Sequence, residues 1–207
     1  SSIDKMGRYA YCNQPAITKW NLSRFAESLV PLIDKNVDIA IKSATELIDT
    51  FGEKYEEKWI NMMRKKLGFL GVENKDKFLI VDLLTWMHQK KVDYTNTFCN
   101  LMNMKTTEDK NYEDVDFKNW KKRWIERLRT SNNTTEKYLK LMRSVNPLVI
   151  PRNHKVEEAL ETAEQGDFKS VIKIIEILKK PYLQKKNIIE YQIPSPFDKN
   201  YQTFCGT

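Results

Sequence analysis

The stretch VNPLVIPRNHKVEEAL, residues 145–160, organises the helical pattern in the second half of the chain. Two prolines bracket an apolar triplet, and the polar run Arg152, Asn153 and His154 then opens an amphipathic segment with helical spacing. This spacing predicts a helix from Arg152 to Gln165, and Gly166 is a natural end for it. The stretch contains no catalytic motif by itself.

The composition bounds the class of protein. Among 207 residues, 41% are hydrophobic, 30% are charged and only six are glycine, a balance that favours an all-α protein over a sheet protein. The net charge of +7 comes from lysines interleaved with Asp and Glu, which favours a solvated surface over a nucleic-acid site. The chain shows neither an apolar run of roughly 20 residues nor a signal-peptide pattern. We therefore expect a cytoplasmic protein without nucleic-acid or membrane partners.

Apolar residues spaced by three and four predict a series of helices within one helical region, residues 1–207. The predicted helices are 15–31, 37–67, 74–88, 94–104, 117–128, 138–144, 152–165 and 168–179. Pro15 suits a first turn, whereas Pro31 and Gly68 are predicted to end the first two helices.

Polar residues mark the remaining boundaries. Asp93 and Asp167 are predicted to cap the helices that follow them. In the helix 117–128 the arginines, Arg127 among them, are predicted to lie away from the apolar side. The charged segment 105–114 predicts an exposed loop, and 182–207 predicts an extended tail.

Local motifs offer little chemistry. The two histidines do not form an HExxH pattern, and the sequence lacks a phosphate-binding glycine loop. His88 closes an apolar helix, where its charge suits the helix dipole. For His154 a capping or hydrogen-bonded role is favoured over that of a base. Three cysteines without CxxC spacing do not indicate a zinc site, and Cys99 is predicted to be a small buried hydrophobe.

Several motifs, in the same order along the chain, closely resemble the selenoprotein O (YdiU) family. They are GRYAYCNQP at 7–15, WNLSRFAE at 20–27, MRKKLG at 63–68, DYTNTF at 93–98, the opening stretch through PRNH at 151–154, EQGD at 164–167, PY at 181–182 and FCGT at 204–207. The FCGT ending resembles the bacterial, cysteine-containing branch. The resemblance covers essentially the whole chain.

This resemblance implies a protein-kinase-like enzyme, of a family long described as pseudokinases, that transfers AMP from ATP to Ser, Thr or Tyr hydroxyls of proteins. The family uses ATP with Mg or Mn, and its ATP-binding lysine, catalytic Asp and metal ligands lie upstream of the motif at 7–15. The resemblance thus implies that this chain is the C-terminal part of a kinase-like C-lobe plus its helical extension. We expect no catalytic, cofactor-binding or metal-binding residue in it, and no activity in the chain alone.

The resemblance also gives expectations for particular residues. Arg8, Asn13 and Gln14 would follow the metal-binding loop and brace the active site, unless they only cap and anchor the first helix. In the opening stretch, the family markers are expected to form a structural junction between two helical layers; they are Asn146, Pro147, Arg152, Asn153 and His154.

Cys205 occupies the position where family members carry cysteine or selenocysteine. The resemblance implies a redox-sensitive disulfide for this position, and Cys12 is the candidate partner in this chain, although it is not in the family register. An unpaired tail thiol in a reducing cytosol is the alternative, and it is favoured.

Two functions from different classes remain open at this point. The first is part of a protein adenylyltransferase whose partners are its N-terminal kinase-like part and its protein substrates. The second is a freestanding helical binding or scaffold module without enzymatic activity.

Overall fold

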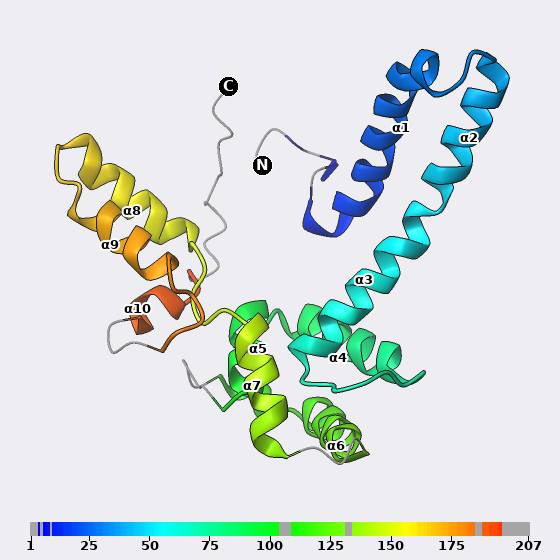
Figure 1. Cartoon of the computed structure of the whole chain (residues 1–207). Helices are drawn as coiled ribbons and strands as arrows, with labels where there is room; N and C mark the ends of the chain where they lie inside the picture. Colours follow the sequence, from blue (N-terminus) through cyan, green and yellow to red (C-terminus); the bar gives the residue numbers. More distant parts are fainter. Residues whose placement is uncertain are drawn as a thin grey trace. The chain divides into compact units, whose positions relative to one another are not determined.

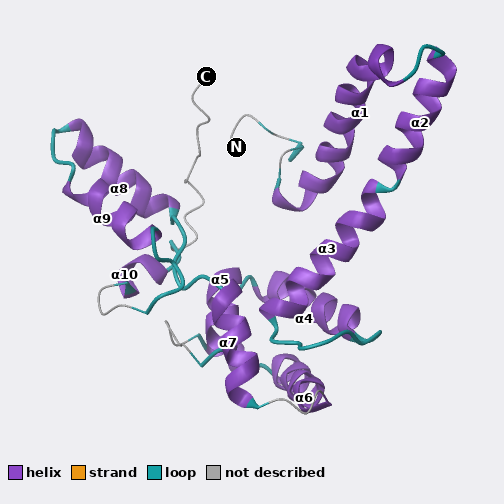
Figure 2. Cartoon of the chain, viewed as in Figure 1, coloured by secondary structure: helices purple, strands orange, loops and turns teal. Residues whose placement is uncertain are grey.

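The computed structural model describes residues 4, 6–8, 10–103, 109–130, 134–184 and 188–195. All regular elements in these ranges are helices, and none of these residues lies in a strand (Figures 1 and 2). The all-α fold class is therefore confirmed. The chain divides into two compact units: unit 1 comprises residues 1–59 and 198–207, and unit 2 comprises residues 60–197.

Unit 1 is built around a helical hairpin. Its elements are η1 (Tyr11–Asn13), α1 (Gln14–Ile33), α2 (Val37–Asp49) and the first part of α3 (Phe51–Lys66). The side chain of Asn36 caps α2 by accepting hydrogen bonds from the backbone N–H groups of Asp38 and Ile39, at 2.9 and 3.3 Å. Helices α1 and α2 lie side by side (Figure 1).

Two helix ends predicted for this part of the chain are wrong. Helix α1 does not stop at Pro31 but continues to Ile33, because a proline removes one backbone donor without preventing the next residues from staying helical. The predicted helix 37–67 is two helices, α2 and α3, separated at Thr50. The Thr50 hydroxyl donates to the backbone oxygen of Leu47 at 2.7 Å, and such a bond competes with the regular helical pattern.

Unit 2 contains the remaining elements. They are the rest of α3, then α4 (Asp76–Lys90), α5 (Tyr94–Leu101), η2 (Lys110–Glu113), α6 (Val115–Thr130), α7 (Thr135–Val145), α8 (Asn153–Glu164), α9 (Lys169–Leu178) and α10 (Ile189–Gln192). Helices α4 and α6 pack against each other, as do α8 and α9. Asp93 caps α5 as predicted, and its carboxylate accepts the backbone N–H of Asn96. The sequence predicts that Asp167 caps the next helix, but Phe168 is the residue before α9, and the Asp167 carboxylate instead accepts the backbone N–H of Lys169, the first helical residue.

The core of unit 2 is apolar and aromatic. Its fully buried side chains include Met63, Leu67, Ile80, Leu83, Phe98, Met102, Phe117, Met142 and Leu148. Two tryptophans of α6 direct their indole N–H groups to carbonyl oxygens: Trp120 to Leu79 at 2.8 Å and Trp124 to Leu67 at 2.9 Å. These bonds let the large rings pack inside without leaving a buried donor unpaired.

Gly68 ends α3, as the sequence predicts. Its φ of 77° lies in the left-handed region, and the following residue, Phe69, donates its backbone N–H to the oxygen of Arg64 at 2.8 Å. A Cβ at this position would lie 3.0 Å from Met142 Cγ and 3.2 Å from Tyr138 Cβ. Both the backbone angle and the approach of α7 therefore require glycine here.

Two segments predicted to lack regular helix each contain a short one. η2 lies in the expected loop 105–114, where the Asp109 carboxylate accepts the backbone N–H of Asn111 at 2.8 Å. α10 lies in the expected tail 182–207, where buried Gln192 donates to the oxygen of Leu148 at 3.0 Å. Tertiary hydrogen bonds thus organise segments that carry no periodic pattern. Residues 104–108 and 196–207 lie outside the described residues.

Candidate functional site

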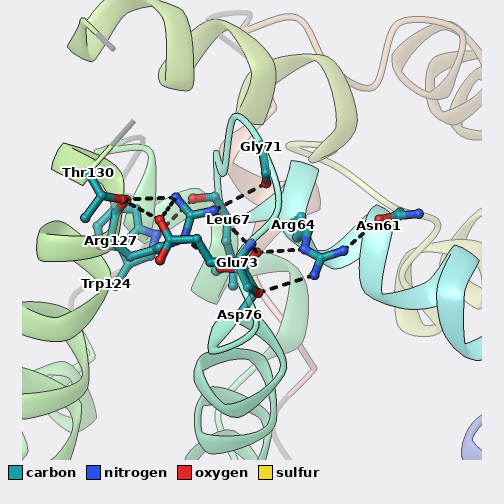
Figure 3. Close-up of polar contacts among 9 residues, drawn as sticks. All are labelled: Asn61, Arg64, Leu67, Gly71, Glu73, Asp76, Trp124, Arg127 and Thr130. Carbon is teal, nitrogen blue, oxygen red and sulfur yellow. Dashed lines mark hydrogen bonds and ion pairs between the residues drawn. The ribbon is translucent and has the colours of Figure 1, made fainter. Parts of the chain in front are cut away.

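A fully buried carboxylate, Asp76, organises one polar cluster at the start of α4 (Figure 3). Its Oδ2 accepts hydrogen bonds from Arg64 Nε at 2.7 Å and from the backbone N–H of Glu73 at 2.9 Å. Its Oδ1 accepts from Arg127 Nε at 2.6 Å. The cluster therefore joins the α3–α4 connection to α6.

Arg127 is held by a second set of contacts (Figure 3). Its Nη2 donates to the backbone oxygen of Gly71 at 3.3 Å, and its Nη1 lies 3.2 Å from Glu73 Oε1. The Thr130 hydroxyl donates to the same Glu73 oxygen at 2.7 Å, and the guanidinium lies 4.7 Å from the centre of the Phe69 ring. A planar guanidinium fits such a fixed set of acceptors better than a lysine would.

The surroundings of Asp76 change the pKa of its carboxyl group. Burial by itself would raise the pKa of Asp76, but hydrogen bonds from Arg127, the Glu73 amide and Arg64 outweigh burial and lower that pKa below its ordinary value. Both carboxylate oxygens are used by these donors. Two guanidinium groups lie within hydrogen-bond distance of this buried carboxylate, where they oppose both proton uptake and the approach of a metal cation, so the geometry favours a structural role for the cluster.

A second cluster is centred on the opening stretch of the sequence. Arg152 Nη1 donates to Asp93 Oδ2 at 2.6 Å, and Nη2 donates to Asp93 Oδ1 at 2.9 Å and to the backbone oxygen of Gln192 at 3.1 Å. Asn96 Nδ2 reaches the same Gln192 oxygen at 3.1 Å. Because the arginine–carboxylate pair is bidentate, it fixes orientation as well as distance between α5 and the start of α8.

The apolar triplet at 148–150 and the asparagine before it also form hydrogen bonds to distant segments. The Leu148 backbone N–H donates to the oxygen of Pro181 at 2.8 Å, just after α9. Asn146 is buried, and its Nδ2 donates to the backbone oxygen of Lys66 at 2.9 Å, at the end of α3. The segment between the two prolines therefore contacts the ends of elements far apart in sequence.

Lys66 is a buried amine next to this segment. Its Nζ lies 4.4 Å from the centre of the Phe98 ring and 5.3 Å from that of Tyr94, and no carboxylate pairs with it within the described residues. Burial lowers the pKa of Lys66 to about 8. Aromatic faces attract a cation, and they partly offset the loss of its hydration.

Cys99 is buried, as predicted. Burial raises the pKa of its thiol to about 11, so the sulfur stays protonated near neutral pH and is a poor nucleophile. Its Sγ lies 3.7 Å from the backbone oxygen of Pro147.

The predicted residues near the start of the chain lie together in unit 1. Arg8 donates its backbone N–H to Asp4 Oδ1 at 2.9 Å, and its guanidinium lies 4.8 Å from the centre of the Trp20 ring. Asn13 occupies the position before α1 and donates from Nδ2 to the oxygen of Gly7 at 2.8 Å. Gln14 is exposed and begins α1.

The remaining predicted residues are divided between the units. Asn153 is exposed and His154 half-buried at the start of α8 in unit 2. Cys12 is exposed on η1 in unit 1, whereas Cys205 lies outside the described residues. The Cys12–Cys205 disulfide stays a hypothesis beside the favoured unpaired thiol, and three free thiols in the oxidised protein would contradict the disulfide.

Sequence reasoning missed the Asp76 cluster and the burial of Lys66. The prediction that Arg127 faces away from the apolar side is wrong, since only 5% of this residue is exposed. A signal was present: Trp120, Trp124 and Arg127 are spaced by four and three, which places the arginine on the buried stripe. Asp76 carried no comparable signal, because acidic residues are common in a first helical turn.

Within the described ranges, no three His, Cys, Asp or Glu side chains form a group that could hold a metal ion. No helix in the same ranges is both long and apolar enough to cross a membrane.

Known proteins are similar to the chain along its whole length. The family model described as protein adenylyltransferase SelO matches residues 1–179. The protein nucleotidyltransferase YdiU of Pelagibacter ubique (strain HTCC1062) is 56% identical over 208 residues, which are 100% of this chain and 43% of the relative. The proteins of the same name from Alcanivorax borkumensis and Nitrosococcus oceani are 47% and 45% identical, again over 100% of this chain and 43% and 42% of their own lengths. The chain thus spans less than half the length of these relatives.

Proposed function

The chain belongs to the SelO family of protein adenylyltransferases, and from this premise we propose that it is the C-terminal, helical part of an enzyme that transfers AMP to proteins. In this reaction a Ser, Thr or Tyr hydroxyl oxygen forms a bond to the α-phosphorus of ATP, and pyrophosphate leaves. The observation that carries the proposal is the match to the family model over residues 1–179.

The described residues do not fit ATP and its metal ions. Kinase-type nucleotide chemistry needs a lysine with an acidic partner, and Asp and Asn side chains that ligate the metal. The buried Lys66 contacts aromatic rings instead of a carboxylate, and Asp76 lies between two guanidinium groups that oppose a metal cation. We therefore assign no step of AMP transfer to these residues. We propose that Mg-ATP binds to a kinase-like part of the whole protein that precedes this chain.

A chimera tests the proposal directly. This chain would replace the matched 43% of the Pelagibacter ubique relative, and AMP transfer would be measured with ATP radiolabelled on the α-phosphate. We expect the chimera to label protein, the 207-residue chain alone to label none, and γ-labelled ATP to give no signal, because the γ-phosphate leaves with pyrophosphate. A folded chimera without transfer, beside an active intact relative, would contradict the proposal and favour a binding module.

We further propose that Arg8, Asn13 and Gln14 position the active-site segment of the whole enzyme. The support is local: Arg8 lies over Trp20 and Asn13 bonds to the Gly7 oxygen, so this turn has a defined conformation. Alanine at each of the three positions in the chimera should lower kcat for AMP transfer and leave the melting temperature unchanged. The control is Lys35→Ala, which changes an exposed residue of the same unit. A melting temperature that falls together with kcat would instead assign these residues to helix capping.

A further inference from the structure

The Lys66 amine is a nucleophilic group that the proposed function does not use. Lys66 is the last residue of α3, and only 7% of its surface is exposed. Two aromatic rings of α5 face the amine: Nζ lies 4.4 Å from the centre of the Phe98 ring and 5.3 Å from that of Tyr94. Because these residues all belong to unit 2, the contacts lie within one compact part of the chain.

The surroundings of Lys66 disfavour its charged form. Among the described residues no carboxylate forms an ion pair with the amine, and the rings attract a cation but supply no strong acceptor for its N–H groups. The titratable groups beside it are the Cys99 thiol and the Tyr94 hydroxyl, which donates to Met63 Sδ at 3.6 Å. Burial lowers the pKa of Lys66 to about 8, against an opposing effect of Cys99. A larger share of this amine is therefore neutral near pH 7 than of an ordinary lysine, and the neutral amine is the nucleophile.

The main chain at Lys66 is held by the segment that follows α7. Asn146 is buried there, and its Nδ2 donates to the Lys66 backbone oxygen at 2.9 Å. The next residue, Leu67, is fully buried in the core. The contact of the amine with the α5 rings therefore depends on the folded state, and so should the chemistry of the amine.

We propose that Lys66 is an acylation site for small acyl phosphates. The neutral amine attacks the acyl carbon and forms a C–N bond, the bond from that carbon to the phosphate oxygen breaks, phosphate leaves, and the nitrogen releases a proton to water. The product is an uncharged amide, so the reaction removes a buried cation that is costly to desolvate. Methylation would keep that charge and bring no such gain. A compact donor is required, because little of the Lys66 surface is open to solvent.

Competitive acetylation of the 207-residue chain tests the proposal. The folded chain is treated briefly with acetyl phosphate from about pH 6 to about pH 10, a range that includes the pKa of Lys66 and approaches that of an ordinary lysine. Tandem mass spectrometry then gives the initial rate at each lysine. The matched control is Lys65, the exposed neighbour on the same helix. A second control is the same chain unfolded in guanidinium chloride, where the aromatic contacts are lost.

In the folded chain we expect Lys66 to be acetylated at least about 5-fold faster than Lys65 at pH 7. A pKa of about 8 gives roughly 100-fold more neutral amine than the ordinary lysine value of about 10.4, and burial and lower basicity reduce this advantage. The rate at Lys66 should reach half its maximum near pH 8, whereas the rate at Lys65 keeps rising with pH. In the unfolded chain the two rates should agree within about a factor of two.

Three results would overturn the proposal. The first is acetylation of Lys66 no faster than that of Lys65 at pH 7 in the folded chain. The second is acetylation of Lys66 in the unfolded chain alone, which would show that burial excludes the reagent. The third is an equal preference for Lys66 in both states, which would assign the reactivity to the local sequence instead of the fold.

Discussion

Unit 1 and unit 2 are built from helices of similar length, but they bury their side chains differently. In unit 1, α1 has 20 residues and buries only Ile17, whereas in unit 2 the 16-residue α6 buries Phe117, Trp120, Trp124, Arg127 and Leu128. The two helices bury different numbers of side chains because they have different neighbours. Helix α6 packs against more than one segment of unit 2, since its tryptophans bond to Leu79 and to Leu67. An amphipathic pattern therefore predicts a helix in both units but a core in only one.

Buried polar groups follow the same division. Every buried polar or charged residue among the described ones lies in unit 2 or at the end of α3 that belongs to it: Lys66, Asp76, Thr95, Asn96, Thr97, Arg127, Asn146 and Gln192. A buried charge is costly unless it has partners. Unit 2 should thus be sensitive to changes that unit 1 tolerates, and four pairs of substitutions test how burial decides that sensitivity.

The largest effect is expected at Asp76. Asp76→Ala would remove the buried carboxylate that Arg64 and Arg127 share, and breaking a buried pair costs about 3–5 kcal/mol of unfolding free energy. The matched control is Asp82→Ala, which removes an exposed pair with Arg123 and should cost no more than about 1 kcal/mol. Both losses can be measured by urea unfolding, with hydrogen exchange of peptides from each unit as the probe of which unit unfolds. Similar losses in the two variants would contradict the role assigned to the cluster.

The lowered pKa of Asp76 also predicts that the folded state loses stability at acidic pH. Because the folded state lowers the pKa of Asp76, its contribution is present above the ordinary Asp pKa of about 3.9 and is lost as pH falls through the lower folded value.

The next largest effect is expected at Lys66, where a substitution should raise the unfolding free energy instead of lowering it. Its pKa of about 8 in the folded state lies below the ordinary lysine value of about 10.4, so the unfolded chain binds more protons between these values and stability rises with pH. At pH 7, Lys66→Met should therefore raise the unfolding free energy by up to about 3 kcal/mol.

This gain should shrink between pH 8 and pH 10. The difference between wild type and variant isolates Lys66, because Cys99 and Tyr112, whose pKa values are raised by burial, titrate in both proteins. Lys65→Met, at an exposed neighbour, is the control. A pH-independent difference would contradict the assignment.

Substitution of one glycine in each unit should change the stability by a smaller amount. Gly68→Ala in unit 2 forces a left-handed alanine against Met142, and we expect a loss of about 2 kcal/mol. Gly52→Ala in unit 1 places a Cβ in open space within α3, and we expect a gain of about 0.5–1 kcal/mol. Thermal unfolding of the two variants should shift in opposite directions.

The smallest effect is expected at Leu32. Because its side chain is largely exposed in this chain, Leu32→Ala should change stability by no more than about 0.5 kcal/mol. Leu83→Ala, at a fully buried leucine of unit 2, should cost about 2–5 kcal/mol. A large loss from Leu32→Ala would show that the Leu32 side chain is packed in solution.

Much of the helical framework was predictable from the sequence. Gly68 ends its helix and Asp93 caps the next because left-handed glycine and carboxylate caps act over three or four residues. The predicted stop at Pro31 is wrong because the proline removes only its own backbone donor, and the two residues after it stay helical. The sequence identified the candidate residues between 145 and 154, but it did not identify the residues to which they bond.

The sequence by itself determined that this protein is helical, where most of its helices begin and end, and which family it belongs to. Only the tertiary structure decided that Arg127 bonds to Asp76, 51 residues earlier in the chain, and that Arg152 bonds to Asp93, 59 residues earlier. It also decided that the Lys66 amine lies over the rings of Tyr94 and Phe98. The tertiary structure decided as well that α6 buries most of its apolar side chains, whereas α1 buries only Ile17. Helix signals depend on neighbours within one turn, whereas burial and ion pairing depend on which distant helices pack together, and periodicity does not encode that choice.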